Sequence, residues 1–165
     1  MPDTDLILTR LAVRVGRHLL ANRRTVATAE SCTGGWIAKA LTDIAGSSQW
    51  LIEGFVTYSD ESKMRGLGVP RAVLRTRGAV SEATVRAMAT GALLRSGAQM
   101  AVAVTGIAGP GGAVPAKPVG TVWLGWAQRR GRGIRVAVQL RHFRGDRDAV
   151  RRKTVRAALE GLLGH

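Results

Sequence analysis

Hydrophobic residues recur at helical spacing in several stretches of the chain. In the first, over residues 4–21, Leu8, Leu11, Val15 and Leu19 share one helical face, which predicts an amphipathic helix. Similar patterns, with capping residues such as Ser81 and Asp146, indicate later helices. The predicted helices after the first cover residues 36–44, 60–66, 69–74, 81–95 and 146–162.

Extended segments lie between these helices. The predicted strands cover residues 25–28, 55–58, 100–104, 120–127 and 134–143. The continuous apolar run at 100–104 is typical of a buried central strand. The short connection at 128–133 predicts an antiparallel hairpin. Because helices alternate with strands elsewhere, we expect a single three-layer α/β/α domain over residues 1–165, with a mixed, mostly parallel sheet of about five strands.

Charge and composition narrow the possible functions. The net charge of +14 suggests a nucleic-acid partner, but 21 of the 25 basic residues are arginine, which indicates a chain-wide bias. We therefore expect no nucleic-acid partner. A single cysteine, Cys32, excludes an internal disulfide, and the three histidines lack metal-ligand spacing. No apolar run approaches the roughly 18 residues of a membrane span, so we expect a soluble cytoplasmic protein without a cofactor.

Polar residues gather where three predicted strands end. In open α/β sheets, ligands bind beyond the carboxyl ends of the strands. The three segments are 31–35, 58–63 and 105–112, and they contribute Ser31, Thr33, Tyr58, Lys63 and Thr105. We expect them to converge on one site.

Ser31 and Lys63 form a candidate nucleophile and base. No histidine lies near the three segments, whereas a lysine in an apolar cleft can lose its proton near neutral pH. Tyr58 could relay a proton or hold the amine, and the N–H groups of residues 32–35 could hold an oxyanion. The alternatives are that Ser31 only caps the next helix, that Lys63 is a surface residue and that Tyr58 only packs. Cys32 is expected to be a buried inert thiol.

Several motifs in order make the chain resemble the CinA C-terminal domain family. They begin with Thr28–Gly35, Gly46–Ser48 and Phe55–Ser59. They continue with Gly78–Ser81, Thr105–Pro110, Lys117–Val122 and Phe143–Arg147. The resemblance extends from about residue 6 to residue 162. The stand-alone members of this family are nicotinamide-nucleotide amidohydrolases, and the larger N-terminal domain of full-length CinA proteins is not matched.

The resemblance implies a reaction and roles for individual residues. It implies deamidation of nicotinamide mononucleotide (NMN) to nicotinate mononucleotide and ammonia by a metal-free serine–lysine pair. Ser31, Lys63 and Tyr58 stand at the family's motif positions. Ser48 also lies in a family motif and is the second candidate, as nucleophile or as substrate ligand. The family fold, a three-layer domain with a five-stranded mixed sheet, agrees with the predicted strands.

The resemblance also implies a phosphate site and an assembly. The expected substrate-binding residues, besides Ser48, are Thr33, Gly34, Gly35, Thr105, Gly106 and Arg147. Family members form dimers or larger homo-oligomers, and Trp50, Trp123 and Trp126 could serve an interface or the core. Two rival functions remain: a nucleotide-binding module without turnover, and a basic nucleic-acid-binding protein.

Overall fold

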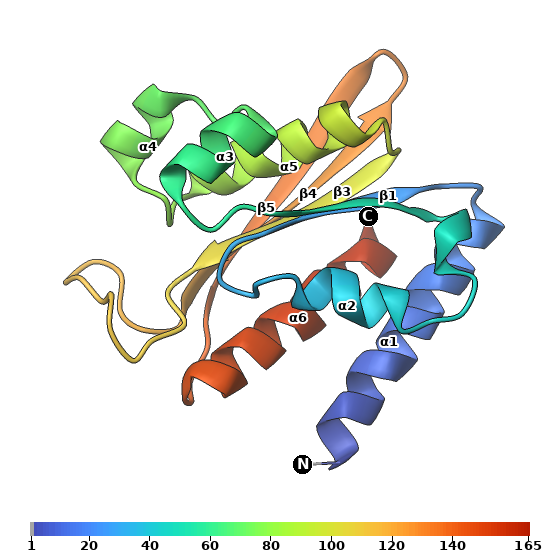
Figure 1. The fold of residues 1–165 in the computed structure, drawn as a ribbon, viewed down its shortest axis with the longest axis horizontal. Helices are drawn as coiled ribbons and strands as arrows, with labels where there is room; N and C mark the ends of the chain where they lie inside the picture. Colours follow the sequence, from blue (N-terminus) through green and yellow to red (C-terminus); the bar gives the residue numbers. More distant parts are fainter. Residues whose placement is uncertain (1) are drawn as a thin grey trace.

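The computed structural model describes residues 2–165, with side chains from residue 5 onward, and shows a sheet between two helical layers (Figure 1). The helices are α1 (Pro2–Ala21), α2 (Trp36–Thr42), α3 (Asp60–Leu67), α4 (Arg71–Arg77), α5 (Glu82–Ser96) and α6 (Arg147–Gly164), with a 3₁₀ turn, η1 (Ser47–Gln49). The strands are β1 (Val26–Glu30), β2 (Leu51–Val56), β3 (Met100–Gly106), β4 (Thr121–Arg130) and β5 (Gly133–His142). The three-layer α/β/α architecture is therefore confirmed.

The sheet is mixed, as predicted. Its strand order is β2-β1-β3-β4-β5, in which β1 pairs in parallel with β2 and β3, while β4 runs antiparallel to β3 and β5. Four of the five strands consequently point the same way. The β4–β5 hairpin turns over two residues, Gly131 and Arg132, because both strands extend further than the sequence pattern indicated. Gly131 takes the positive φ of 55° that such tight turns require.

Two apolar cores lie on opposite faces of the sheet. One packs α1, α2 and α6 against it and contains Trp50 and Trp126; the other packs α3, α4 and α5 (Figure 1). Both of these tryptophans are buried within one chain, and Trp123 is half-buried. None of the described helices is both long and apolar enough to span a membrane.

The alternation of side chains along β1 decides where the next residues point. Val26 belongs to the core on the α2 side, whereas Ala27 and Ala29 belong to the core on the α5 side. Since successive strand residues face opposite sides, Glu30 points toward α2 and Ser31 toward α3. The strand thereby delivers two adjacent polar side chains to two different layers.

The second strand begins and ends earlier than the sequence pattern indicated. It covers Leu51–Val56 in place of residues 55–58. Thr57 and Tyr58 lie outside the strand because the chain there turns into the N-cap of α3, where the Ser59 hydroxyl accepts a hydrogen bond from the Ser62 N–H.

Candidate active site

Ser31 and Lys63 lie side by side at the carboxyl end of β1. The Lys63 Nζ is 3.1 Å from the Ser31 Oγ, and the two residues are only 1% and 8% exposed, respectively. Lys63 is the fourth residue of α3, and helical side chains point back toward the helix N-terminus, so its amine reaches the segment before the helix. Two of the three segments expected to converge, 31–35 and 58–63, meet here. The burial of Lys63 removes its interpretation as a surface residue.

Two backbone carbonyls hold the Lys63 amine. Its Nζ donates to the Thr57 carbonyl at 2.9 Å and to the Tyr58 carbonyl at 3.0 Å. A neutral amine has two N–H donors and one lone pair, so these carbonyls can take both donors while the lone pair faces the Ser31 hydroxyl. An ammonium would find three acceptors in the same place. The geometry therefore suits both proton states of a general base.

Burial lowers the pKa of Lys63 below its ordinary value of 10.5. Removal from water disfavours the charged form, and the negative charge of Asp60 opposes the shift to a smaller extent. Neutral amine is consequently more abundant near neutral pH than for an exposed lysine.

The carboxylate of Glu30 occupies the N-terminus of α2. Glu30 is fully buried and accepts hydrogen bonds from the Thr33 hydroxyl (2.6 Å) and from the N–H groups of Gly35 (3.1 Å), Ile37 (2.9 Å) and Ala38 (2.8 Å). The protein's own carboxylate thus takes the place where an anionic ligand would bind to helix N–H groups.

Of the four backbone N–H groups at residues 32–35 that were expected to bind an oxyanion, only two remain available within the part of the chain that the structure describes. The Gly35 N–H bonds to Glu30, and the Gly34 N–H donates to the Ser31 carbonyl at 3.1 Å. Within residues 2–165, the N–H groups of Cys32 and Thr33 have no partner on another residue. These two groups directly follow the Ser31 side chain, where an oxyanion would form after its attack.

Cys32 lies beside Ser31 with its thiol buried. Burial raises the pKa of this thiol to about 12, with a minor contribution from Glu30. A thiol of that pKa holds almost no thiolate at neutral pH, which agrees with the expected buried, unreactive thiol.

Two of the expected phosphate donors are already engaged. The Thr33 hydroxyl donates to Glu30, and the Thr105 hydroxyl donates to the Ala79 carbonyl at 2.8 Å. A phosphate dianion only accepts hydrogen bonds, so neither hydroxyl can serve it while these bonds persist. Gly106 stands opposite Val122 in the β3–β4 ladder, and a Cβ there would lie 2.7 Å from the Val122 side chain.

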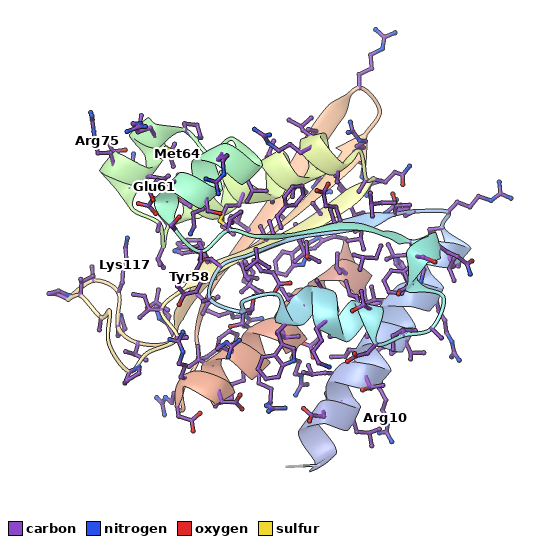
Figure 2. All side chains as sticks on the ribbon, in the orientation of Figure 1. Arg10, Tyr58, Glu61, Met64, Arg75 and Lys117 are labelled. Carbon is purple, nitrogen blue, oxygen red and sulfur yellow. The ribbon has the colours of Figure 1, made fainter. Side chains whose placement is uncertain are left out.

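Tyr58, on the chain segment that precedes Lys63, meets Arg147 at the surface of the molecule. The Tyr58 side chain is 63% exposed, and its hydroxyl accepts from the Arg147 guanidinium at 3.1 Å. Arg147 also donates to the Gly109 carbonyl at 2.7 Å. Figure 2 shows Tyr58 projecting near Glu61 of α3. The Tyr58 carbonyl, and not its hydroxyl, holds the Lys63 amine, which corrects the expected role of the side chain.

Ser48 lies away from this site. It belongs to η1, which precedes β2 and therefore sits at the amino end of the strands, opposite the edge that carries Ser31. Its side chain is exposed to solvent. Within one chain, Ser48 is not placed to act as a nucleophile or ligand at the Ser31–Lys63 pair.

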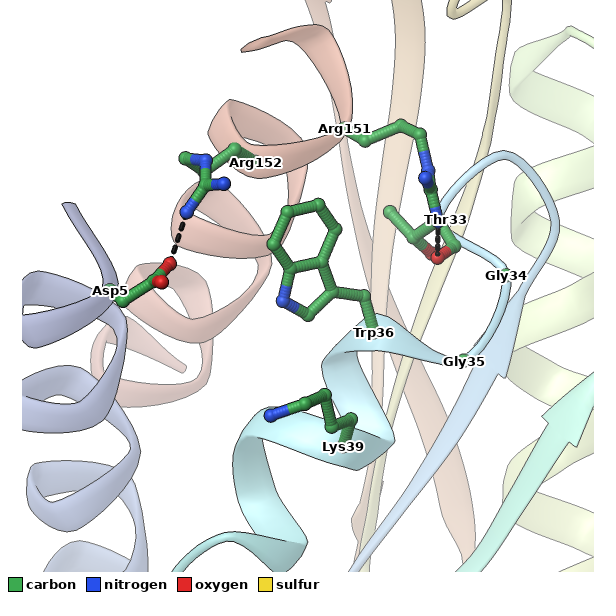
Figure 3. Close-up of a pocket in the computed structure, with 8 residues that line it drawn as sticks. All are labelled: Asp5, Thr33, Gly34, Gly35, Trp36, Lys39, Arg151 and Arg152. Atoms are coloured by element: carbon green, nitrogen blue, oxygen red, sulfur yellow. Dashed lines mark hydrogen bonds and ion pairs between the residues drawn. The ribbon is translucent and has the colours of Figure 1, made fainter. Parts of the chain in front are cut away.

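A separate pocket of about 370 Å³ opens on the α2 side of the sheet. Trp36 projects into it between the guanidinium groups of Arg151 and Arg152, 5.4 and 4.9 Å from the ring centre (Figure 3). Thr33, Gly34 and Gly35 contribute to this pocket, and neither Ser31 nor Lys63 lines it.

Two residues of this region, Arg151 and Glu30, were not among the site residues predicted from the sequence. Arg151 donates to the carbonyls of Cys32 and Thr33 from α6, over a hundred residues away in the chain, so no local signal announced it. Glu30 did leave a signal. A glutamate at the end of an apolar strand, five residues before a glycine-led helix, suits an acceptor for that helix's free N–H groups.

The described residues contain no group of three or more His, Cys, Asp or Glu side chains placed to hold a metal ion. What they do contain is a nearly buried serine–lysine pair beside two backbone N–H groups that have no partner on another residue. These features define the class of the protein: an α/β domain equipped for nucleophilic acyl chemistry.

Comparison with known proteins identifies the family. The sequence model of the CinA C-terminal domain matches residues 8–165, so the chain belongs to that family. It is 56% identical to the nicotinamide-nucleotide amidohydrolase PncC of Pseudomonas putida over 94% of this chain and 95% of the relative. It is 53% identical to the protein of that name from Escherichia coli K12, over 96% and 94%. The solved structure of a competence/damage inducible protein, CihA, from Agrobacterium tumefaciens superposes with a TM-score of 0.89 at 48% identity, covering 96% of this chain and 94% of that one.

Proposed function

We propose that this chain is a nicotinamide-nucleotide amidohydrolase, which converts NMN to nicotinate mononucleotide and ammonia in pyridine nucleotide salvage. The full-length similarity to the two PncC proteins supports the substrate. The observation that carries the chemistry is the 3.1 Å contact between the Lys63 amine and the Ser31 hydroxyl, with the amine also held by two backbone carbonyls.

In the first half-reaction, Ser31 Oγ attacks the carboxamide carbon while neutral Lys63 takes the hydroxyl proton. The carbonyl oxygen becomes an oxyanion, which the N–H groups of Cys32 and Thr33 stabilise. When the tetrahedral intermediate collapses, the C–N bond breaks, and Lys63 returns its proton to the departing nitrogen, which leaves as ammonia. The product bound to Ser31 is a nicotinoyl ester.

In the second half-reaction, water attacks the same carbon and gives a proton to Lys63. The ester bond breaks, the proton returns to Ser31 Oγ, and nicotinate mononucleotide leaves. No step requires a metal ion or an organic cofactor, and Lys63 serves as base and acid in turn.

Arg147 is the proposed ligand of the substrate phosphate. It is exposed at the surface of the molecule, and it uses two of its donors on Tyr58 and Gly109. A guanidinium has five N–H donors, so further donors remain for a phosphate. The hydrogen bond from Arg147 places the Tyr58 ring at the same surface, where it can stack on the pyridine ring.

The enzyme in this proposal works in the cytoplasm as a homodimer or larger homo-oligomer. Two apolar side chains of the edge strand β2, Ile52 and Val56, are 48% and 52% exposed. They offer a surface along β2 that a second copy could cover, and Val56 stands at the end of the strand that leads to Tyr58.

The deciding experiment measures ammonia release from NMN by the wild-type protein, Ser31→Ala and Ser48→Ala, with and without a chelator. We expect chelator-insensitive turnover by the wild type, near-normal turnover by Ser48→Ala, and a loss of about 1,000-fold or more in Ser31→Ala. Release by Ser31→Ala with loss in Ser48→Ala would overturn the assigned nucleophile. A folded wild-type protein that binds NMN without releasing ammonia would be a binding module.

A further inference from the structure

Glu30 is a fully buried carboxylate one residue before the proposed nucleophile, and the mechanism above does not use it. Both of its oxygens accept hydrogen bonds. Oε2 accepts from the Thr33 hydroxyl and from the N–H groups of Gly35 and Ile37, and Oε1 accepts from the Ala38 N–H. Within residues 5–165, no lysine or arginine forms an ion pair with it. The N-terminus of α2 therefore supplies the compensating positive potential.

These bonds hold the turn after Ser31 in a particular shape. The turn carries two residues of positive φ, Gly34 at 61° and Gly35 at 95°. On its inner side the turn is tied to Glu30, and on its outer side Arg151 donates to the carbonyls of Cys32 (3.2 Å) and Thr33 (2.9 Å). Arg151 and Glu30 together therefore fix the orientation of the peptide groups in the turn.

The fixed turn determines which N–H groups stay available. Glu30 engages the donors of the helix N-terminus, and the N–H groups of Cys32 and Thr33 remain without a partner on another residue in the described chain. A preorganised donor costs no reorganisation during the reaction, whereas a mobile turn would have to be ordered in each turnover.

We propose that Glu30 is a positioning residue, whose carboxylate holds the 31–35 turn so that the N–H groups of Cys32 and Thr33 face the oxyanion formed at Ser31. This inference rests on the proposed amidohydrolase function. It assigns the strand's last side chain a role in transition-state stabilisation without any contact with substrate. Loss of that role lowers kcat and leaves ground-state binding of the nucleotide nearly unchanged.

The test compares Glu30→Gln with the wild type, once the wild type has been shown to release ammonia from NMN. Glutamine keeps the volume, removes the charge and turns an NH₂ group toward the Ala38 N–H. We expect kcat to fall by about 10- to 100-fold, as for a misplaced catalytic geometry, with KM changed by less than about threefold. Activity should still rise with pH as Lys63 loses its proton, at the same pH as in the wild type, because Glu30 acts on the turn and not on the amine.

A matched control separates positioning from general destabilisation. Leu19→Ala removes a fully buried side chain near the end of α1, at the opposite edge of the sheet from Ser31. At a temperature where both variants are folded, Leu19→Ala keeps the wild-type kcat. Three results would each overturn the proposal: an unchanged kcat in Glu30→Gln, an effect on KM alone, or a shift in the pH at which activity rises with deprotonation of Lys63.

Thr33 provides a milder second test if Glu30→Gln does not fold. Thr33→Val deletes one bond to Glu30, and Thr33→Ser keeps the hydroxyl. We expect a lower kcat in Thr33→Val and recovery in Thr33→Ser; equal kcat values in the two variants would contradict the proposal.

Amide hydrogen exchange at Gly35, Ile37 and Ala38 adds a readout that needs no substrate. Faster exchange at these sites in whichever Glu30 or Thr33 variant folds, relative to Leu19→Ala, supports the anchoring, and unchanged exchange overturns it. A wild type inactive on NMN would refute the function but leave this readout interpretable.

Discussion

At the scale of single residues, Lys63 is subject to two opposing effects: burial disfavours its charged form, and hydrogen bonds to backbone carbonyls stabilise the buried amine. A buried ammonium is costly, and burial accordingly lowers the pKa of this side chain. Hydrogen bonds to the carbonyls of Thr57 and Tyr58 offset part of the cost of removing the amine from water. If Lys63 is the base, as proposed, arginine cannot replace it, because a guanidinium does not give up its proton.

The pH dependence of catalysis follows from that lowered pKa. In the proposed mechanism catalysis needs the neutral amine, so kcat/KM should rise with pH along a single ionisation that lies below 10.5, and flatten above it. The measurement is ammonia release from NMN across pH 6 to 10. A limb at or above the ordinary lysine value would show that Lys63 is not the base.

Substitution by arginine separates charge from base chemistry at the same position. We expect Lys63→Arg to lose about 1,000-fold or more in turnover. Lys39→Arg is the matched control, because Lys39 is an exposed lysine paired with Asp43, and it should retain normal turnover. Normal turnover in Lys63→Arg would mean that only the positive charge matters.

At the scale of elements, α3 owes its position to a close contact with α5. A Cβ on Gly91 of α5 would overlap the carbonyl of Leu67, the last residue of α3. The helix that carries Lys63 thus packs against the glycine backbone, and its distance from β1 depends on that contact.

Gly91→Ala should therefore disturb the site from a distance. Alanine favours a helix by about 1 kcal/mol over glycine, but overpacking costs about 1–3 kcal/mol, so we expect a net loss of stability. We also expect turnover of the folded variant to fall by about tenfold, as Lys63 moves from Ser31. Urea unfolding and ammonia release measure the two effects.

Gly164→Ala is the matched control for this substitution, since a Cβ there meets nothing within 4 Å. It should change neither stability nor turnover appreciably. Full turnover in a destabilised Gly91→Ala would show that the position of α3 is not coupled to the site.

At the scale of the whole molecule, the net charge of +14 suits an anionic small-molecule substrate better than the nucleic-acid partner that it first suggested. A positive field raises the local concentration of a phosphate-bearing ligand. Several arginines of α6 are also engaged within the chain: Arg151 binds backbone carbonyls, and Arg152 and Arg156 pair with acidic residues.

Ligand binding should raise the melting temperature of Ser31→Ala, which binds without turnover. At 100 times the dissociation constant, NMN adds about 2.7 kcal/mol, or about 5 to 10 °C for a domain of this size. Nicotinamide riboside, without the phosphate, should give a smaller rise at equal concentration. Thermal unfolding measures both shifts.

The same measurement on Ser31→Ala combined with Arg147→Met tests the proposed phosphate ligand. We expect the advantage of NMN over the riboside to disappear in the double variant. An undiminished advantage would place the phosphate elsewhere, for example in the basic pocket around Trp36.

The chain's periodicity was enough to predict its elements and their layers. Apolar spacing is a short-range property, so it revealed the helices, the five strands and the hairpin. The rule that ligands bind at the carboxyl ends of strands also placed Ser31 and Lys63 in one site. Strand boundaries were less accurate, as at Tyr58, because capping of the next helix decides where a strand ends.

Hydrogen-bond partners were decided only by the tertiary structure. The N-terminus of α2 looked free for an anion in the sequence, yet the Glu30 side chain fills it, because strand alternation and packing turn that carboxylate inward. Ser48 lies in another family motif, Gly46–Ser48, and stands at the amino end of β2, whereas the site lies beyond the carboxyl ends of the strands. Each donor and acceptor can satisfy a partner near or far in the chain, and only the packed fold determines which one it meets.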